Sequence, residues 1–330
     1  MPGLRSQENK IRDLRPETWH PYNDDHHNDD HRRRNPDLKR LLRTSVIQTV
    51  ASLHLDEVML RRLRWRASRG SPLVLVVEMH ETLQRDAGQF RRQLEWVAKH
   101  FTFISPETFF GLWERTPTPP NWSKPAVLFT FDDGRESNYT VGAPMLESMG
   151  TRGLFLVVPE FVGLTAQNAR DFYYSRIDIR GLAPSECGEQ WTPMTPDQLA
   201  DLTRRGHSIG NHTLSHVSLA GLSPSDLERQ IGTSAAKISS WVQKSVEAFA
   251  WPNSWNAIKR EAWDLIRKTH RFCFSPCPGT TNCSEDSPHL IWRTEIEAYY
   301  SDSEYRFMYS GLIDQIWAGK RRRLGTMLKT

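Results

Sequence analysis

Long apolar stretches are missing from this 330-residue chain. No run approaches the roughly 20 consecutive apolar residues that a membrane-spanning helix needs. The first residues, Met1–Arg15, are polar throughout and lack the apolar core of a secretory signal peptide. We therefore expect a cytoplasmic protein without a transmembrane segment.

A strong charge imbalance is also missing, and cysteine is scarce. The formal net charge is only +4, and acidic residues are interspersed with lysine and arginine over most of the chain. This balance does not favour a nucleic acid as substrate or partner. The four cysteines, Cys187, Cys273, Cys277 and Cys283, match no common zinc spacing. Reduced thiols are expected in the cytosol, with a disulfide or a structural metal as the alternatives.

Aliphatic residues are rare in Met1–Arg34, which is rich in Asp, His, Asn and Arg. Such a segment buries too little apolar surface to offset the entropy of ordering, so we expect a disordered leader that could bind metal ions loosely. A basic helical segment follows, including a stretch from about Leu55 to Trp65. Its arginines favour weak contact with an anionic membrane surface; the alternative is a helix packed on the main domain or on a partner. We expect residues 1–70 to be an N-terminal extension and residues 71–330 to be one larger domain.

The first segment with chemical character is Val127–Gly134, which reads VLFTFDDG. The apolar run predicts a buried strand, and Gly134 permits a turn just after it. Two adjacent carboxylates are too costly to bury unpaired, so Asp132 and Asp133 are expected at the carboxyl end of the strand. Enzymes with parallel sheets place their ligands at this end. Because successive residues point to opposite sides, the two acids can have different roles.

A second segment, Gly206–His216, reads GHSIGNHTLSH. His212 and His216 are four residues apart, so a helix or a tight turn can present both imidazoles to one ion. One carboxylate with two histidines is a common ligand set for a divalent transition metal that keeps positions open for water and substrate. With Asp133 as the carboxylate, the two segments together predict a metal site.

Strand-like and helix-like segments alternate five or six times along the chain, which predicts a parallel α/β sheet. The pattern alone does not show whether the sheet closes into a barrel. A long aperiodic segment, Phe161–Pro193, carries several aromatic residues that either stack on sugar rings or cover the core. The expected strands are Leu73–Val77, Phe101–Ile104, Val127–Phe131, Leu154–Val158, Ser208–Gly210, Ala248–Trp251, Arg271–Phe274 and Leu290–Ile296; the expected helices include Phe90–His100, Asn138–Met149, Thr195–Arg205, Ser223–Gln243, Asn256–Thr269 and Asp302–Trp317, followed by a solvated basic tail at Lys320–Arg323.

At these residues the sequence resembles the polysaccharide deacetylases, the NodB-homology carbohydrate esterases of family 4. Thr130–Gly134 is similar to the first motif of that family, His212–His216 to the second, and Phe249–Asn253 more weakly to the third. The resemblance extends over about Leu73 to Ile296. It implies a distorted, incomplete (β/α) barrel, here with a helical N-terminal extension, and hydrolysis of an N-acetyl or similar N-acyl group on an amino sugar. It also implies a divalent metal, most often Zn²⁺, with Co²⁺, Ni²⁺ or Mn²⁺ as alternatives.

The resemblance assigns roles by position. Asp133, His212 and His216 would bind the metal, and Asp132 would be the general base. The oxyanion or substrate would contact the segment Trp251, Pro252 and Asn253, with a backbone N–H of Asn253 as the donor. Thr213 and Ser215 would support the ligands.

Two departures from the family pattern affect these assignments. The arginine that positions the base in the third motif is replaced by Glu247, and we consider Arg293 as its substitute. The histidine of the last motif, the general acid, has no counterpart after His289. Some family members carry a histidine after the first strand, so His80 is the favoured acid and His289 the alternative.

Two other functions are compatible with these residues. One is a catalytically weak or silent relative that binds a glycan or a protein partner, although such a protein would not need all four of the metal and base residues. The other is a deformylase or amidase acting on a lipid-linked or small acylated amine. The sugar, the acyl group and the oligomeric state are left open.

Overall fold

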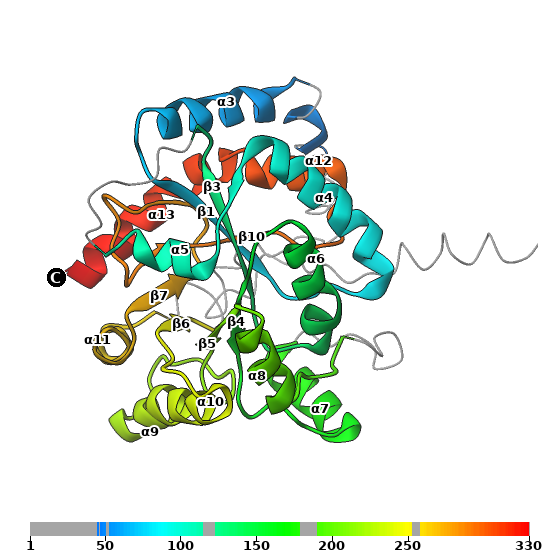
Figure 1. The fold of residues 1–330 in the computed structure, drawn as a ribbon. Coiled ribbons are helices and arrows are strands. Elements are labelled where there is room, and N and C mark those ends of the chain that lie inside the picture. Colours follow the sequence, from blue (N-terminus) through cyan, green and yellow to red (C-terminus); the bar gives the residue numbers. More distant parts are fainter. Residues whose placement is uncertain are drawn as a thin grey trace, which may run out of the picture.

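The computed structural model describes residues 45, 47–50, 53–114, 123–178, 190–252 and 258–329. A mixed sheet forms its centre, with the strand order β10-β1-β3-β4-β5-β6-β7-β9 (Figure 1). All neighbours along this path pair in parallel, and β2 and β8 join at the side. The strands are β1 (Leu73–Met79), β2 (Thr102–Phe103), β3 (Ala126–Phe131), β4 (Leu154–Val157), β5 (Ser208–Asn211), β6 (Ala248–Ala250), β7 (Phe272–Ser275), β8 (Thr280–Asn282), β9 (Ile291–Trp292) and β10 (Thr294–Glu295).

One short segment brings the two ends of this sheet together. β9 pairs with β7, and β10 pairs with β1, yet only Arg293 separates β9 from β10 in the chain. The segment 291–295 therefore spans the gap between the last and the first strand. This arrangement confirms the predicted distorted, incomplete (β/α) barrel.

Helices surround the strands (Figure 1). Their apolar sides pack on the outer face of the sheet, where Val77, Phe129 and Phe155 are buried. The helices are α3 (Leu55–Ser68), α4 (Ala87–His100), α5 (Pro106–Gly111), α6 (Ala143–Ser148), α7 (Ala166–Phe172), α8 (Pro196–Arg204), α9 (Pro224–Glu228), α10 (Ser234–Val242), α11 (Arg260–Thr269), α12 (Asp302–Tyr309) and α13 (Leu312–Lys329), with a 3₁₀ turn η1 (Gln84–Asp86) and π-helical turns η2 (Asn138–Gly142), η3 (Tyr173–Ile177) and η4 (Arg229–Thr233).

A separate apolar cluster fills the space enclosed by the strands. Along β1, Val74 and Val76 belong to this inner cluster, whereas Leu75 and Val77 belong to the outer one. This alternation is the two-residue period of a strand. Phe109 of α5 packs into the inner cluster, with its ring centroid 6.0 Å from that of Phe274.

The structure corrects several sequence-based expectations. The supposedly aperiodic segment after Phe161 contains α7 and η3, whose aromatic residues pack on each other around Tyr173. The last expected helix breaks at Gly311, where φ is +80°, and continues as α13. The basic residues Lys320–Arg323 therefore lie within a helix rather than in a tail. The short elements α5 and β8 were not predicted.

The expectations for the cysteines, the N-terminal leader and membrane helices have different outcomes. Cys273, Cys277 and Cys283 are buried free thiols, as expected. Cys187, the leader and most of the first basic helix lie outside the described residues. Within the described part of the chain, no helix is both long and apolar enough to cross a membrane.

Candidate active site

The sequence-predicted residues gather at the carboxyl end of the barrel. The alternation that places Val74 and Val76 inside continues to Glu78, and on β3 it continues from Leu128 through Thr130 to Asp132. Glu78 and Thr130 are paired neighbours in the β1–β3 register. The strands thus direct two carboxylates into the inner mouth of the barrel, where Asp132 is only 1% exposed.

Asp133 turns away from this row because the chain leaves the strand in a left-handed conformation. Its φ is +72°, and that of Gly134 is +92°. A Cβ on Gly134 would also lie 3.3 Å from Val157, so glycine fits here for two reasons. The turn brings Asp133 Oδ1 to 3.7 Å from His216 Nε2 and 3.9 Å from His212 Nε2.

The two histidines come from a turn rather than from a helix. Thr213 and His216 have φ values of +67° and +56°, and the Thr213 hydroxyl accepts a hydrogen bond from the His216 backbone N–H. The Nδ1 atom of each imidazole lies within hydrogen-bond distance of a carbonyl: Ala250 at the end of β6 for His212 (3.1 Å), and Arg176 in η3 for His216 (2.9 Å). Donation from Nδ1 leaves both Nε2 lone pairs directed at Asp133.

These three residues fit a divalent metal ion. They offer ligand atoms that all lie within 4.8 Å of one another. Asp133 Oδ1 is buried and accepts no hydrogen bond from any described residue, which is costly unless a cation binds there. Burial lowers the pKa of His212 to about 4, so its ring is neutral, as a metal ligand must be. The predicted ligand set is therefore brought together in space.

The second oxygen of Asp133 is held by Arg135, which sequence reasoning missed. Arg135 Nη2 donates to Asp133 Oδ2 at 2.8 Å, and its Nε donates to the same oxygen at 3.1 Å. Arg135 Nη1 lies 3.5 Å from Oε2 of the buried Glu81. Burial would raise the pKa of Asp133, but Arg135 and the nearby histidines outweigh burial and hold this pKa well below its usual value. Asp133 is consequently ionised.

Asp132 has a different arginine. Arg293, fully buried between β9 and β10, binds both Asp132 oxygens at 2.7 and 2.9 Å and reaches Glu78 Oε1 at 3.2 Å. Burial raises the pKa of Asp132, but Arg293 outweighs it and the net pKa is lowered. The structure thus places Arg293 against Asp132, whereas Glu247 lies near the protein surface and pairs with Arg271 at 2.8 Å.

His80 lies next to Asp132. Ligand atoms of Glu78, His80 and Asp132 all lie within 4.8 Å of one another. His80 Nδ1 is 2.7 Å from Glu297 Oε1, and Glu297 also accepts the backbone N–H of His80. Burial alone would lower the pKa of His80, but the hydrogen bond that His80 donates to Glu297 and the negative charge of Glu297 outweigh burial and raise this pKa well above its usual value. Glu297 therefore favours the protonated ring. His289 precedes β9 and so lies toward the amino ends of the strands, away from the site.

The third motif contributes differently from expectation. The Trp251 ring is 1% exposed within an apolar cluster, and its backbone N–H donates to the carbonyl of Phe274. Pro252 is buried and has no N–H, and Asn253 lies outside the described residues. What this segment visibly supplies is the Ala250 carbonyl that orients His212.

The aromatic segment lies beside the metal ligands. Tyr173 is buried, with the Arg135 guanidinium 5.0 Å from its ring centroid. Phe172, Tyr174 and Trp191 pack around it and are partly exposed. The segment therefore covers a small core of its own and also supplies the Arg176 carbonyl to His216.

Comparisons with known proteins agree with this geometry. Residues 120–270, which contain both metal-ligand segments, match the family model described as polysaccharide deacetylase. Over these residues the chain is similar to polysaccharide deacetylases. The Bacillus subtilis (strain 168) protein YxkH, whose name describes a polysaccharide deacetylase, is 22% identical over 165 residues, which cover 50% of this chain and 49% of that protein. The chain thus spans about half the length of this curated relative.

Solved structures of deacetylases share the barrel fold of this chain. The Streptococcus pyogenes deacetylase PplD, in complex with acetate, superposes with a TM-score of 0.53 at 17% identity, covering 73% of this chain and 98% of that one. IcaB from Ammonifex degensii superposes with a TM-score of 0.55 at 18% identity, covering 73% and 97%. At such identities the likeness establishes the barrel fold, and the roles of individual side chains depend on the geometry above.

Proposed function

We propose that this protein is a metal-dependent hydrolase that removes an N-acetyl or similar N-acyl group from an amino sugar in a glycan, a glycoconjugate or a sugar-containing small molecule. The observation that carries the proposal is the meeting of Asp133, His212 and His216 around a carboxylate oxygen that lacks a hydrogen bond from any described residue. The family match supports the deacetylase chemistry.

Asp133, His212 and His216 would hold the ion, with Zn²⁺ as the first choice and Co²⁺, Ni²⁺ or Mn²⁺ as alternatives. A bound ion of this kind lowers the pKa of a coordinated water and polarises the substrate carbonyl. The chain prepares the ligands by fixing both imidazole rings through backbone carbonyls and by keeping Asp133 ionised through Arg135.

Asp132 would be the general base that accepts the proton of the attacking water. It is ionised, lies 3.5 Å from His212 Nε2, and is held in one orientation by two hydrogen bonds from Arg293. Arg293 thus takes the positioning role of the arginine that the third motif lacks.

His80 would be the general acid. Its raised pKa keeps a proton available at neutral pH, and Glu297 fixes the ring through Nδ1, so Nε2 can donate to the leaving amine. A base and an acid on adjacent strands can move one proton each during amide cleavage. Tyr174 and Trp191, which are partly exposed beside the ligands, offer apolar faces to a sugar ring.

The test compares the two adjacent aspartates. Metal content is measured by elemental analysis, and acetate release is measured from N-acetylated amino sugars with and without a chelator. We expect Asp132→Asn to retain the metal and to lose about 10²- to 10⁴-fold in kcat, the usual contribution of a general base. We expect Asp133→Asn to lose both metal and activity. Normal turnover in Asp132→Asn would contradict the base assignment, and tight glycan binding without acyl release would favour the silent alternative.

A further inference from the structure

The helix α3 has apolar side chains on two opposite sides. Leu60, Leu63 and Ala67 are buried against the barrel. On the opposite side, Val58 is 56% exposed and Trp65 is 55% exposed. These two lie seven residues apart, which is about two helical turns, so they share one face.

The exposed apolar group extends beyond these two residues. Leu55 on the same helix is 42% exposed, and Leu53 just before it is 62% exposed. A helix that only packed on the barrel would carry polar residues on its outward side. Three large exposed apolar side chains on α3, with a fourth just before it, therefore indicate an interaction surface.

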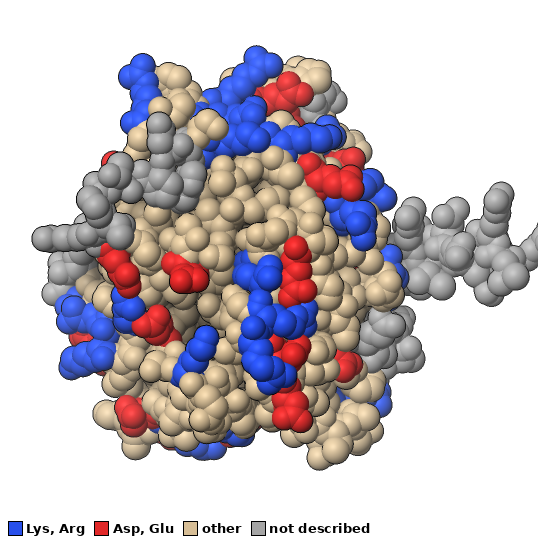
Figure 2. Space-filling model, in the orientation of Figure 1, with Lys and Arg blue, Asp and Glu red and all other residues tan. Residues whose placement is uncertain are grey.

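Arginines flank this group. Arg61, Arg62, Arg64, Arg66 and Arg69 stand against only two acids, Asp56 and Glu57, over residues 55–69. Helical spacing places Arg62 and Arg69 beside Val58 and Trp65, and the Arg69 guanidinium lies 4.4 Å from the Trp65 ring centroid. Figure 2 shows Lys and Arg side chains gathered at the top of the molecule, where α3 lies.

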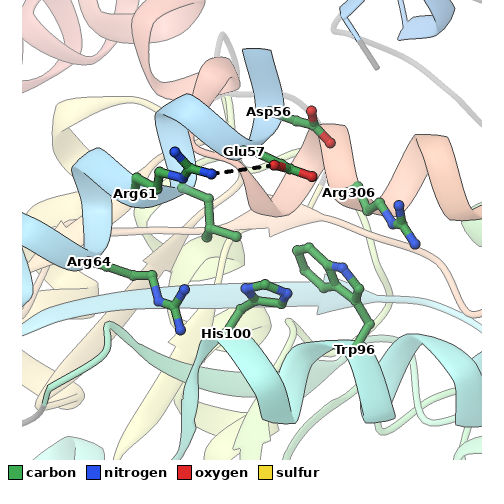
Figure 3. A pocket seen from close by; sticks show the side chains of 8 residues that line it. Asp56, Glu57, Arg61, Arg64, Trp96, His100 and Arg306 are labelled. Carbon is green, nitrogen blue, oxygen red and sulfur yellow. Dashed lines mark ion pairs between the residues drawn. The ribbon is translucent and has the colours of Figure 1, made fainter. Parts of the chain in front are cut away.

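A hollow of about 230 Å³ continues this positive surface between α3, α4 and α12 (Figure 3). Arg61, Arg64, Arg306 and His100 line it together with Asp56 and Glu57, and Arg61 pairs with Glu57 at 3.8 Å. Burial lowers the pKa of His100, and the charges of Arg64, Lys124 and Arg306 lower it further. Three arginines, Arg61, Arg64 and Arg306, thus line the hollow against the two acids Asp56 and Glu57.

We propose that the outward side of α3, made of Leu55, Val58 and Trp65 with the flanking Arg62 and Arg69, docks on an anionic phospholipid surface together with the exposed Leu53 just before the helix. The apolar side chains enter the headgroup layer, where Trp is favoured, and the guanidinium groups contact lipid phosphates. We favour a phospholipid surface over an acidic protein. The arginines match the negative charge of the headgroups, and the aromatic and aliphatic residues between them match the apolar layer beneath. This docking is independent of the proposed deacetylase chemistry.

The test is co-sedimentation of the full chain with phospholipid vesicles. We expect binding to vesicles of phosphatidylglycerol and phosphatidylcholine in equal parts, little binding to phosphatidylcholine alone, and release at about 1 M salt, where screening is strong. Each arginine near an anionic surface contributes about fivefold in affinity, so Arg62→Gln with Arg69→Gln should weaken binding roughly 25-fold. Trp65→Ala with Val58→Ser should weaken it roughly tenfold or more.

Matched controls come from α13. Ile316 is 66% exposed, and Arg322 and Arg323 are exposed on the same helix. Ile316→Ser and the pair Arg322→Gln with Arg323→Gln should leave vesicle binding within about twofold, since α13 exposes two large apolar side chains, Ile316 and Met327, that lie about three helical turns apart and do not form a continuous apolar group. Circular dichroism melts identify any variant that fails to fold, and the salt and lipid dependence of the unaltered chain tests the proposal without any variant.

Three outcomes would overturn the proposal. The first is equal binding to neutral and anionic vesicles, or no binding to either. The second is a loss of binding in the α13 controls as large as in the α3 variants. The third is a dimer in sedimentation equilibrium that Trp65→Ala dissociates, since a second copy would then cover this face.

Discussion

Asp132 and Asp133 are adjacent in the chain, yet they belong to two different halves of the site. Asp133, His212 and His216 form the ion half, in which one carboxylate oxygen lacks a hydrogen-bond donor among the described residues. Asp132 and His80 form the acid–base half, in which both Asp132 oxygens are held by Arg293 and His80 is held by Glu297. The first half is incomplete without a cation, whereas the second is already neutralised by the protein. In the proposed mechanism, metal binding and proton transfer would therefore be supported by separate sets of side chains.

The largest expected effects come from removing the arginine of each half. Arg293→Met leaves Asp132 and Glu78 buried without their partner, which should cost about 3–5 kcal/mol of unfolding free energy. Because it also frees the base from its orientation, kcat should fall about 10²-fold or more. Added Zn²⁺ should not restore stability, since Arg293 does not touch the ion half.

Arg135→Met is the matched control for this prediction. It leaves Asp133 and Glu81 without their arginine and should destabilise the metal-free protein by a similar amount. A cation bound by Asp133 would compensate most of this loss, so Zn²⁺ should raise the melting temperature far more in Arg135→Met than in Arg293→Met. Equal rescue of both variants would show that the two halves are not separate.

The pH dependence tests the acid–base half alone. Glu297 raises the pKa of His80, so Glu297→Gln should lower it and move the alkaline limb of the kcat/KM profile down by at least about one pH unit. The sign follows from linkage. A raised pKa contributes stability that is complete below the unfolded value of about 6.5 and is lost as pH rises through the folded value. In the wild type the melting temperature should therefore fall as pH rises through the folded pKa of His80, and in Glu297→Gln this fall should be absent.

Glu285→Gln serves as the control because Glu285 is exposed on the surface. It should leave both the rate profile and the melting curve unchanged. Metal content should also be unaltered in Glu297→Gln, because Glu297 is not a member of the ligand triad. An unshifted alkaline limb in Glu297→Gln would assign the proton donor to another group.

The sequence revealed the ion half more completely than the acid–base half, for a physical reason. The proposed metal ligands lie in two short segments with a characteristic spacing, so local pattern was enough to predict that they lie together. The partners of Asp132 and His80 are instead supplied by distant strands: Arg293 is 161 residues from Asp132, and Glu297 is 217 residues from His80. Only barrel closure by the segment 291–295 brings them together, and strand periodicity does not encode that closure.

The same distinction applies to the fold. Most strands were predicted because their apolar runs are local, as in β1 and β3. The helix α7 was missed because only Ala169 of it is buried and its packing is completed by aromatic residues of the neighbouring η3. The extent of α13 was missed because the basic run Lys320–Arg323 suggested a tail, although Trp317 and Leu324 of that helix are buried.

The smallest expected effect concerns a residue that supports the ion half from outside. His270 Nε2 lies 3.2 Å from Asn211 Nδ2, and Asn211 Oδ1 accepts the backbone N–H of Thr213 in the histidine turn. Burial lowers the pKa of His270 to about 4, so the ring must stay neutral in the folded protein. The contribution of the neutral His270 ring to stability is therefore complete above the unfolded pKa of about 6.5 and is lost as pH falls toward 4.

Chemical denaturation of the wild type and of His270→Gln across this pH range tests this contribution. The free energy of unfolding should fall less with decreasing pH in the variant, by about 1–3 kcal/mol at pH 4. Parallel declines would mean that protonation of His212 or of other groups, rather than of His270, controls the acid sensitivity of the histidine turn.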